Sequence, residues 1–223
     1  KMFKKLIIYI LIIFSLKNYY HFFTWYLGND QMIIEEAFML SLQASLPMFL
    51  AIFLIHYYYY PRDNTGHASV ISFPPIILLF FINAGFTFST LNMYHLQLYK
   101  VPELFDLFRH SGIGLLLIII SLVIFSISLN AFNKANENPI PTSSTELIIF
   151  RSIYGYSRNP MYLAMLLIQI GMGMLLSMVH IVFFTLFTYI VLKYYVIIPE
   201  EKYLEEKFSQ SYINYKKSVR RWV

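Results

Sequence analysis

The chain contains no cysteine, so disulfides, thiolate metal sites and cysteine nucleophiles are excluded. Charged residues are also scarce: they make up 13% of the 223 residues, against about 25% in soluble domains. The six histidines show no spacing typical of metal or haem ligands, and the sequence has no internal repeat or low-complexity domain. We therefore predict neither a metal site nor a haem.

Apolar residues dominate what is present. Hydrophobic residues account for 58% of the chain, with 19 tyrosines and 21 phenylalanines, the rings that gather where lipid meets water. This composition predicts an integral membrane protein. The net charge of +5 does not indicate nucleic-acid binding, because the basic residues lie between the apolar runs. They are better explained by membrane orientation and by contact with anionic lipid headgroups.

Six apolar runs approach the roughly 20 residues that a membrane-crossing helix needs. We predict an all-α membrane protein with about six transmembrane helices, of which the last two form a hairpin. The first arm of that hairpin is short for a full crossing. The predicted spans are Leu6–Tyr26, Ala37–Tyr58, Val70–Leu91, Gly112–Phe132, Pro160–Leu175 and Met178–Ile198.

An amphipathic helix is predicted to follow the hairpin. Pro199 is expected to end the last span and to start this helix, because proline is tolerated at an early helical position. Apolar residues then recur every three or four positions, which predicts one apolar stripe lying on the membrane surface or against a site. The stripe consists of Leu204, Phe208, Tyr212, Tyr215 and Val219.

Charge placement predicts the orientation of the spans. Basic residues precede the first span, occur in segment 133–159 and fill the tail over 202–221. With six crossings, all three regions and both termini fall in the cytoplasm. Only Lys100 and Arg109 then lie clearly on the outer side, in agreement with the positive-inside rule.

Polar residues bracket the hairpin at what should be one membrane face. The motif Arg158-Asn159-Pro160-Met161-Tyr162 opens it, and the pair Glu200-Glu201 closes it. Asn159 is a suitable N-cap and Pro160 a suitable first helical residue, so the free N–H groups of this helix would attract a carboxylate or phosphate. The two carboxylates suit a cation. Alternatively, these residues only cap helices and anchor the spans.

Together these motifs resemble the superfamily of integral membrane methyltransferases that includes isoprenylcysteine carboxyl methyltransferases and phospholipid N-methyltransferases. The resemblance covers about residues 130–223, whereas residues 1–110 carry no recognisable signature. We accordingly expect N-terminal transmembrane helices over 1–110 and a methyltransferase-like module over 111–223. The motifs are Tyr156-Ser157-Arg158-Asn159-Pro160-Met161-Tyr162-Leu163, Pro199-Glu200-Glu201-Lys202-Tyr203-Leu204, and then Phe208, Tyr212, Tyr215, Val219, Arg220 and Trp222.

The resemblance implies methyl transfer from S-adenosylmethionine to a lipophilic acceptor at the cytoplasmic face, with membrane lipids as partners. The acceptor would be an isoprenylcysteine-like carboxylate, a phospholipid amine or a small thiol. Arg158 would orient an acceptor anion or a cofactor carboxylate, and Glu201 would hold the cofactor or help to remove a proton from an amine. Neither a metal nor a covalent nucleophile is needed. The implied cofactor-binding residues are Tyr156, Arg158, Asn159, Pro160, Tyr162, Glu200 and Glu201.

The sequence departs from the family pattern at four places. Asn159 stands where many members have histidine, and Ser209 stands where glycine usually follows the phenylalanine. Ser152-Ile153-Tyr154-Gly155 stands where Gly-Pro-Tyr-Arg is usual, and Ala135-Asn136 stands where an upstream Gly-Thr element is usual. These departures leave the acceptor class open. Two alternatives to a methyltransferase remain: an NADPH-dependent membrane reductase of the sterol reductase type, and a non-catalytic transporter or scaffold.

Overall fold

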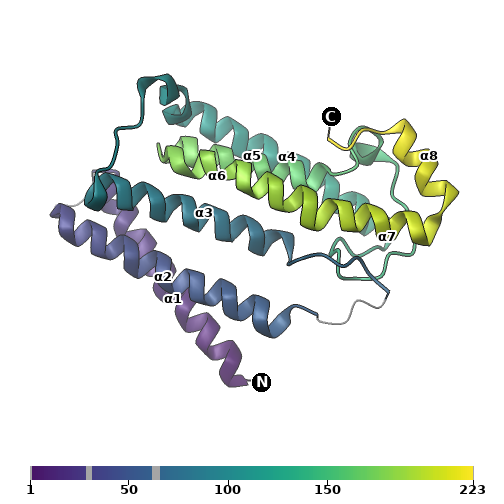
Figure 1. Ribbon diagram of the computed structural model, residues 1–223, viewed down its shortest axis with the longest axis horizontal. Coiled ribbons are helices and arrows are strands. Elements are labelled where there is room, and N and C mark those ends of the chain that lie inside the picture. The colour runs from purple at the N-terminus through teal and green to yellow at the C-terminus, as the bar shows by residue number, and fades with distance from the viewer. Residues whose placement is uncertain (1, 29–31, 62–65, 223) are drawn as a thin grey trace.

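The structure is a computed structural model that describes residues 2–28, 32–61 and 66–222 (Figure 1). The described part is helical and has no strand, so the all-α prediction is confirmed. The long helices are α1 (Met2–Tyr26), α2 (Ile34–Tyr59), α3 (Pro74–Thr90), α4 (Ser111–Ala135), α5 (Pro160–Leu175), α6 (Val179–Leu192), α7 (Ile198–Phe208) and α8 (Gln210–Ser218). Short helical segments are the π-helices Leu91–Leu96 and Lys193–Ile197 and the 3₁₀-helices Glu103–Arg109 and Ser152–Gly155.

Five helical segments of the described chain are long and apolar enough to cross a membrane. Three of them contain the predicted spans Leu6–Tyr26, Ala37–Tyr58 and Gly112–Phe132 in full. The other two overlap the remaining long predictions but begin later, at Pro74 instead of Val70 and at Val179 instead of Met178. By the length and composition of these segments, the chain is an integral membrane protein. The five segments are Phe3–Tyr26, Ile34–Tyr59, Pro74–Leu96, Ser111–Ala135 and Val179–Phe208.

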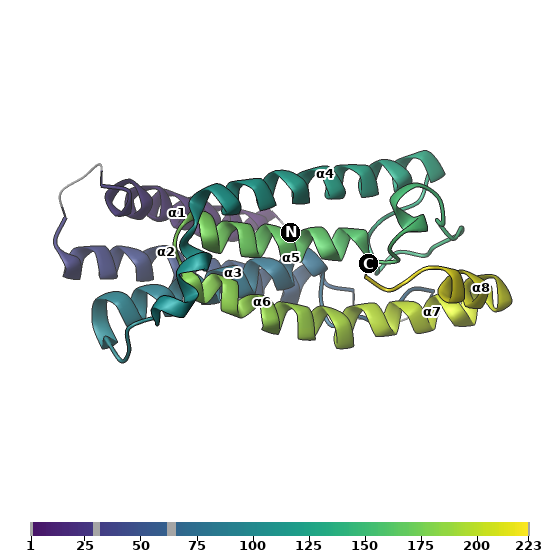
Figure 2. The same ribbon diagram turned by 90° about the horizontal axis from the view of Figure 1, so that it is seen from above.

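The sixth apolar helix, α5, is shorter than a full crossing. Its 16 residues rise about 24 Å, less than the roughly 30 Å of a bilayer's hydrocarbon core. In Figure 2, α5 lies between α4 and α6, and it packs against both. Five helices therefore meet the length of a span where about six were predicted, and α5 is enclosed by its neighbours.

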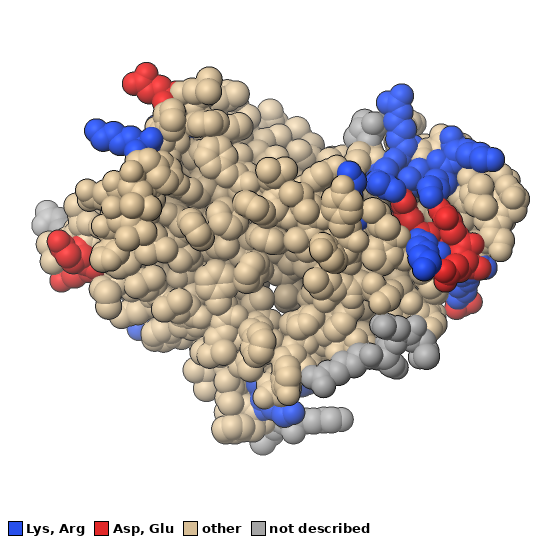
Figure 3. All heavy atoms as spheres, in the orientation of Figure 1, with Lys and Arg blue, Asp and Glu red and all other residues tan. Residues whose placement is uncertain are grey.

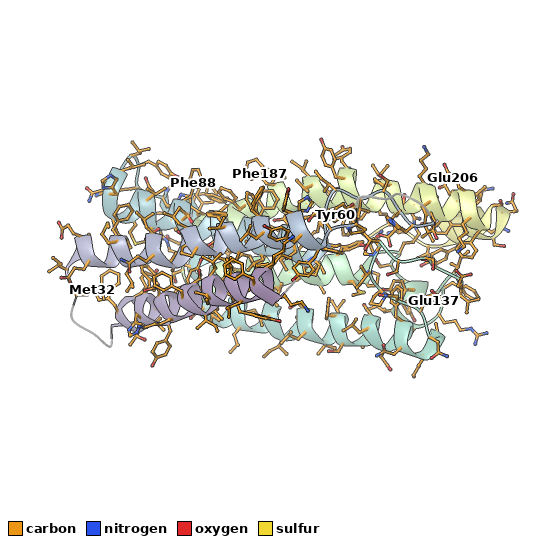
Figure 4. All side chains as sticks on the ribbon, turned by 90° about the horizontal axis from the view of Figure 1, so that it is seen from below. Met32, Tyr60, Phe88, Glu137, Phe187 and Glu206 are labelled. Carbon is orange, nitrogen blue, oxygen red and sulfur yellow. The ribbon has the colours of Figure 1, made fainter. Side chains whose placement is uncertain are left out.

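Successive helices run in alternating directions, so their connections gather at two ends of the molecule (Figure 1). One end holds the α2–α3 and α4–α5 connections together with α7 and α8. The other end holds the α1–α2, α3–α4 and α5–α6 connections. Glu137 and Glu206 lie at the first end in Figure 4, and Met32 lies at the second. We refer to these as the motif end and the opposite end, because the first contains the two sequence motifs.

Charged side chains are concentrated at the motif end. Figure 3 shows Lys, Arg, Asp and Glu clustered over α7 and α8, few charges at the opposite end, and a broad uncharged middle. This distribution matches a protein whose middle faces lipid and whose ends face water.

The crossing of α4 and α5 depends on glycine. A Cβ atom on Gly114 would lie 2.4 Å from the backbone nitrogen of Leu175 and 2.7 Å from the carbonyl oxygen of Gly171. Conversely, a Cβ on Gly171 would lie 2.8 Å from the carbonyl oxygen of Gly114. Small residues let membrane helices approach this closely. Gly173 similarly lets α5 approach α6, because a Cβ there would lie 2.9 Å from the backbone nitrogen of Val182. The α5–α6 turn itself uses Ser177, with φ 54°.

We expect Gly114→Ala to lower the thermal stability of the purified protein. The added methyl group meets backbone atoms, which cannot rotate away, so α4 and α5 must separate at a cost of about 1–3 kcal/mol. Thermal unfolding in detergent measures this change. Gly112→Ala is the matched control, because its Cβ would meet only the His110 ring, at 3.5 Å. Equal melting of the two variants would contradict the packing argument.

Pro199 lies at an early position of α7, as predicted, but the last span runs into that helix without the predicted break. The helix continues from Val179 to Phe208 and passes through the π-helical turn Lys193–Ile197. Pro199 has no N–H to donate to the carbonyl of Tyr195, and that carbonyl accepts a hydrogen bond from the Ile71 N–H at 3.0 Å instead. A neighbouring loop therefore satisfies the carbonyl that proline leaves free, and the helix continues.

The amphipathic tail is two helices rather than the predicted single one. The chain breaks at Ser209, whose φ of 47° is in the left-handed region that favours glycine. The family's usual glycine at this position is explained by the same geometry. The apolar stripe still faces inward, since Tyr212 is 2% exposed and Val219 is 9% exposed.

Candidate functional site

The opening motif lies beneath the C-terminal tail. As predicted, α5 begins at Pro160. Asn159 does not cap it, however: its Nδ2 donates to the carbonyl oxygen of Arg221 at 3.0 Å. The capping prediction is wrong: the tail crosses the start of the helix and binds the Asn159 amide through Nδ2, while Oδ1 accepts no N–H of the first helical turn. The Arg158 backbone N–H likewise donates to the carbonyl oxygen of Arg220 at 2.9 Å.

Arg158 is committed to contacts within the protein. Its Nη2 donates to Glu201 Oε1 at 2.8 Å, and its Nη1 donates to the carbonyl oxygens of Lys216 and Val219. Only 8% of the Arg158 side chain and 7% of the Glu201 side chain are exposed. The Nε–H of Arg158 is buried without a hydrogen-bond partner. The guanidinium therefore retains an unused donor at Nε.

Glu201 joins two guanidinium groups. Arg221 donates from Nη2 to Glu201 Oε2 at 2.6 Å and from Nε to Oε1 at 3.1 Å, while Arg158 approaches Oε1 from the other side. The hydrogen bonds to Glu201 raise the pKa of the Arg221 guanidinium above its ordinary value. Two cations thus neutralise this one carboxylate and bind the tail to α5.

Sequence reasoning missed Arg221. It lies in a basic run, Arg220-Arg221, that was interpreted only as an orientation signal. A buried glutamate in a membrane protein needs a cation, and a basic pair near the end of the same module could have been considered as its source.

Glu200 differs from its neighbour in having no cationic partner among the described residues. One of its oxygens, Oε2, accepts a hydrogen bond from the Tyr162 hydroxyl at 2.9 Å. The opening and closing motifs therefore meet through two contacts, Arg158 with Glu201 and Tyr162 with Glu200. One carboxylate is neutralised, and the other is held only by a hydroxyl.

Tyrosines surround the carboxylates. Tyr154, Tyr212 and Tyr215 line the same cavity, and burial raises the pKa of Tyr154 and Tyr212 and raises that of Tyr215 to about 12. All three keep their protons at neutral pH and remain hydrogen-bond donors. Tyr156, one of the predicted cofactor-binding residues, is 81% exposed and lies apart from this group.

Two adjoining cavities share Arg158, Asn159, Tyr154 and Glu200. The polar cavity encloses about 80 Å³ and is walled by Glu201, the other tyrosines and segment 138–149. The apolar cavity encloses about 330 Å³. Arg158 and Glu200 are the only charged residues among the described ones that line the apolar cavity, and its walls include Phe73, Pro74, Phe125, Phe132, Met161 and Met165.

Segment 138–149 covers the polar cavity and is fastened at two points. Lys207 Nζ donates to Glu146 Oε1 at 3.1 Å. The Tyr203 hydroxyl accepts from the Thr145 N–H at 3.3 Å and donates to the carbonyl oxygen of Gly66 at 2.9 Å. A cavity of about 80 Å³ has room for only a few waters, since ligand pockets usually enclose about 300–1,000 Å³. Entry of a nucleoside-sized ligand therefore requires this cover to move.

No group of three or more His, Cys, Asp or Glu side chains with a metal-binding arrangement occurs within the described ranges. That a metal is absent stays a prediction. The chemistry of the site must be considered from carboxylates, guanidinium groups and phenols.

A polar and an apolar cavity adjoin at one end of the helical bundle, an arrangement suited to a ligand with both polar and apolar parts. Residues 108–211, a little under half of the chain, match the family model described as phospholipid methyltransferase. This segment belongs to the superfamily of isoprenylcysteine and phospholipid membrane methyltransferases, so the resemblance predicted from the motifs is confirmed. The family implies a methyltransferase acting on lipid-like substrates. No curated protein and no solved structure gives a significant match.

Proposed function

We propose that this protein transfers a methyl group from S-adenosylmethionine to the amine of a membrane lipid. The observation that supports this most directly is Glu200, a carboxylate without a cationic partner where the polar and apolar cavities adjoin. An ammonium group on a lipid would supply the missing positive charge. A carboxylate acceptor would instead meet like charge there, because the one guanidinium in the apolar cavity already binds Glu201.

The polar cavity is the proposed cofactor site. Arg158, Asn159, Pro160, Tyr162, Glu200 and Glu201 would frame it, as the family resemblance implies. The residues present fit the group: the unpaired Nε–H of Arg158 is a donor for the amino-acid carboxylate, and the carboxylates attract the ammonium and sulfonium charges. Tyr156 has no part in this arrangement. The bound cofactor supplies an electrophilic methyl group on positively charged sulfur.

Glu200 is the proposed proton acceptor in place of Glu201. A carboxylate held by two guanidinium groups keeps its negative charge and accepts a proton poorly, whereas one without a cation accepts it more readily. Glu200 would take a proton from the lipid ammonium and free the nitrogen lone pair. That nitrogen then bonds to the methyl carbon as the carbon–sulfur bond breaks, and the bonding electrons stay on sulfur. Alignment and exclusion of water provide the rest of the catalysis.

The apolar cavity is the proposed acceptor site. Phe73 and Pro74 belong to the N-terminal half, while Phe125, Phe132 and Met165 belong to the C-terminal half. We propose that residues 111–223 form the methyltransferase module and that helices of segment 1–110 close its lipid side. The motif end would face the cytoplasm, as the basic segments predict.

Methyl labelling tests both the reaction and its orientation. Sealed vesicles with the motif end outward should incorporate label from methyl-labelled S-adenosylmethionine into amine-bearing phospholipids. Vesicles of the opposite orientation should label only after permeabilisation, because the charged cofactor does not cross the bilayer. Vesicles without the protein are the control. Label confined to carboxyl esters would refute the amine assignment. NADPH oxidation without any methyl transfer would support the reductase alternative.

A further inference from the structure

We infer that the cavity at the opposite end of the bundle binds the phosphate group of an anionic membrane lipid. This cavity encloses about 710 Å³ and lies between the α3–α4 connection and the tip of the α5–α6 hairpin. The length of α5, about 24 Å, separates it from the methyl-transfer site. The inference is independent of the reaction proposed above.

The cavity has positively charged walls. Lys100 and Arg109 both line it, and no Asp or Glu is among its described lining residues. Lys100 has no ion-pair partner in the described structure, and Arg109 pairs only with the exposed Asp106. The lining charge therefore favours an anion.

The orientation of the chain in the membrane does not explain why Lys100 and Arg109 occur at this end. They are the only lysine or arginine residues in the connections at this end, and the positive-inside rule disfavours basic residues on the outer side. Both nevertheless lie at the same cavity. A shared ligand accounts for both.

The cavity walls are held in place before any ligand arrives. His180, which is 6% exposed, is hydrogen-bonded to the Tyr99 hydroxyl and to Ser89 Oγ. Asn92 Nδ2 donates to the carbonyl oxygen of Tyr99 at 2.9 Å, and Ser177 Oγ donates to the carbonyl oxygen of Arg109 at 3.3 Å. These bonds connect the loops that carry the two cations to the hairpin, so the backbone bearing both residues is held around one space.

The position of the cavity favours a lipid as the source of the phosphate. The cavity lies at the end of the apolar bundle, between the α3–α4 connection and the hairpin tip, with Met93, Val101 and Val179 among its lining residues. A lipid headgroup can place its phosphate against the two cations while its chains remain along the apolar helices. A free phosphate ion satisfies the same charges without the apolar contacts.

Native mass spectrometry of the detergent-purified full chain tests the inference. The probes are phosphatidylglycerol, zwitterionic phosphatidylcholine and inorganic phosphate. We expect retention of phosphatidylglycerol over phosphatidylcholine. Lys100→Gln and Arg109→Gln should each weaken that retention about fivefold, and the double variant about twenty-fivefold, as expected for one basic residue near an anionic lipid.

Lys134→Gln is the matched control. Lys134 is an exposed lysine near the motif end, so its variant removes the same charge without touching the cavity. Phosphatidylglycerol retention equal in all variants, or equal to that of phosphatidylcholine, would overturn the inference. Displacement of the lipid by inorganic phosphate in the parent protein would assign the site to free phosphate, and lack of displacement would assign it to the lipid. Thermal unfolding identifies any variant that fails to fold.

Discussion

Replacing Glu200 by glutamine should abolish methyl transfer to an amine while leaving the protein folded. The change removes the negative charge but almost no volume, and the glutamine oxygen can still accept the hydrogen bond from Tyr162. Loss of a positioned proton acceptor usually lowers a rate by about 10²–10⁴. The measurement is the turnover rate with saturating S-adenosylmethionine and an amine lipid, together with the melting temperature.

Glu206→Gln is the control for this experiment. It makes the same chemical change six residues along α7, where the side chain is 68% exposed and meets only Lys202, at 3.8 Å. Its rate should equal that of the parent protein. A Glu200→Gln variant with a normal rate would contradict the role of this carboxylate and would favour an acceptor that needs no base.

Replacing Glu201 by glutamine should destabilise the protein. Any loss of activity in this variant should result from unfolding and not from the loss of a catalytic group. The change leaves two guanidinium groups, Arg158 and Arg221, without their shared counter-charge in a buried place. Breaking a buried ion pair usually costs about 3–5 kcal/mol. For a chain of this size such a cost lowers the melting temperature by about 6–20 °C. Thermal unfolding in detergent measures this directly.

Lys202→Gln is the control for Glu201. It changes a charge at the next position, where the side chain is 78% exposed. Its melting temperature should stay within about 2 °C of the parent value, because exposed pairs contribute little. If Glu201→Gln melts like the control, the ion-pair network does not hold the tail. Glu201 would then be free for the catalytic role first predicted for it.

Much of the architecture could be predicted from the sequence because it follows from long apolar runs. The spans appear where about 20 apolar residues occur together, and the even number of helical segments brings the two motifs to one end. The exceptions depend on single backbone atoms. The helix continues through Pro199 because the Ile71 N–H satisfies the carbonyl that proline leaves free. Ile71 is distant in sequence, so the periodicity of the local sequence could not predict this contact. The break at Ser209 depends on one positive φ angle.

The site was predictable as a pair of motifs but not as a network. Residue type and spacing brought Arg158, Tyr162 and the two glutamates together, since a hairpin of fixed helical rise must return to its starting face. The spacing of the motifs could not predict which glutamate binds the arginines and which binds only Tyr162. That division depends on Arg221, which approaches from a tail whose fold was predicted as one straight helix.

Because the C-terminal tail completes the candidate site, that site can form only at the end of synthesis. Arg221 is made 63 residues after Arg158, and its bonds to Glu201 and Asn159 complete the site. At about 5–20 residues per second, about 3–13 s pass between the synthesis of Arg158 and that of Arg221. During that interval the helices can insert into the membrane, but the ion-pair network is still incomplete. Insertion of the helices into the bilayer would therefore precede assembly of the candidate site.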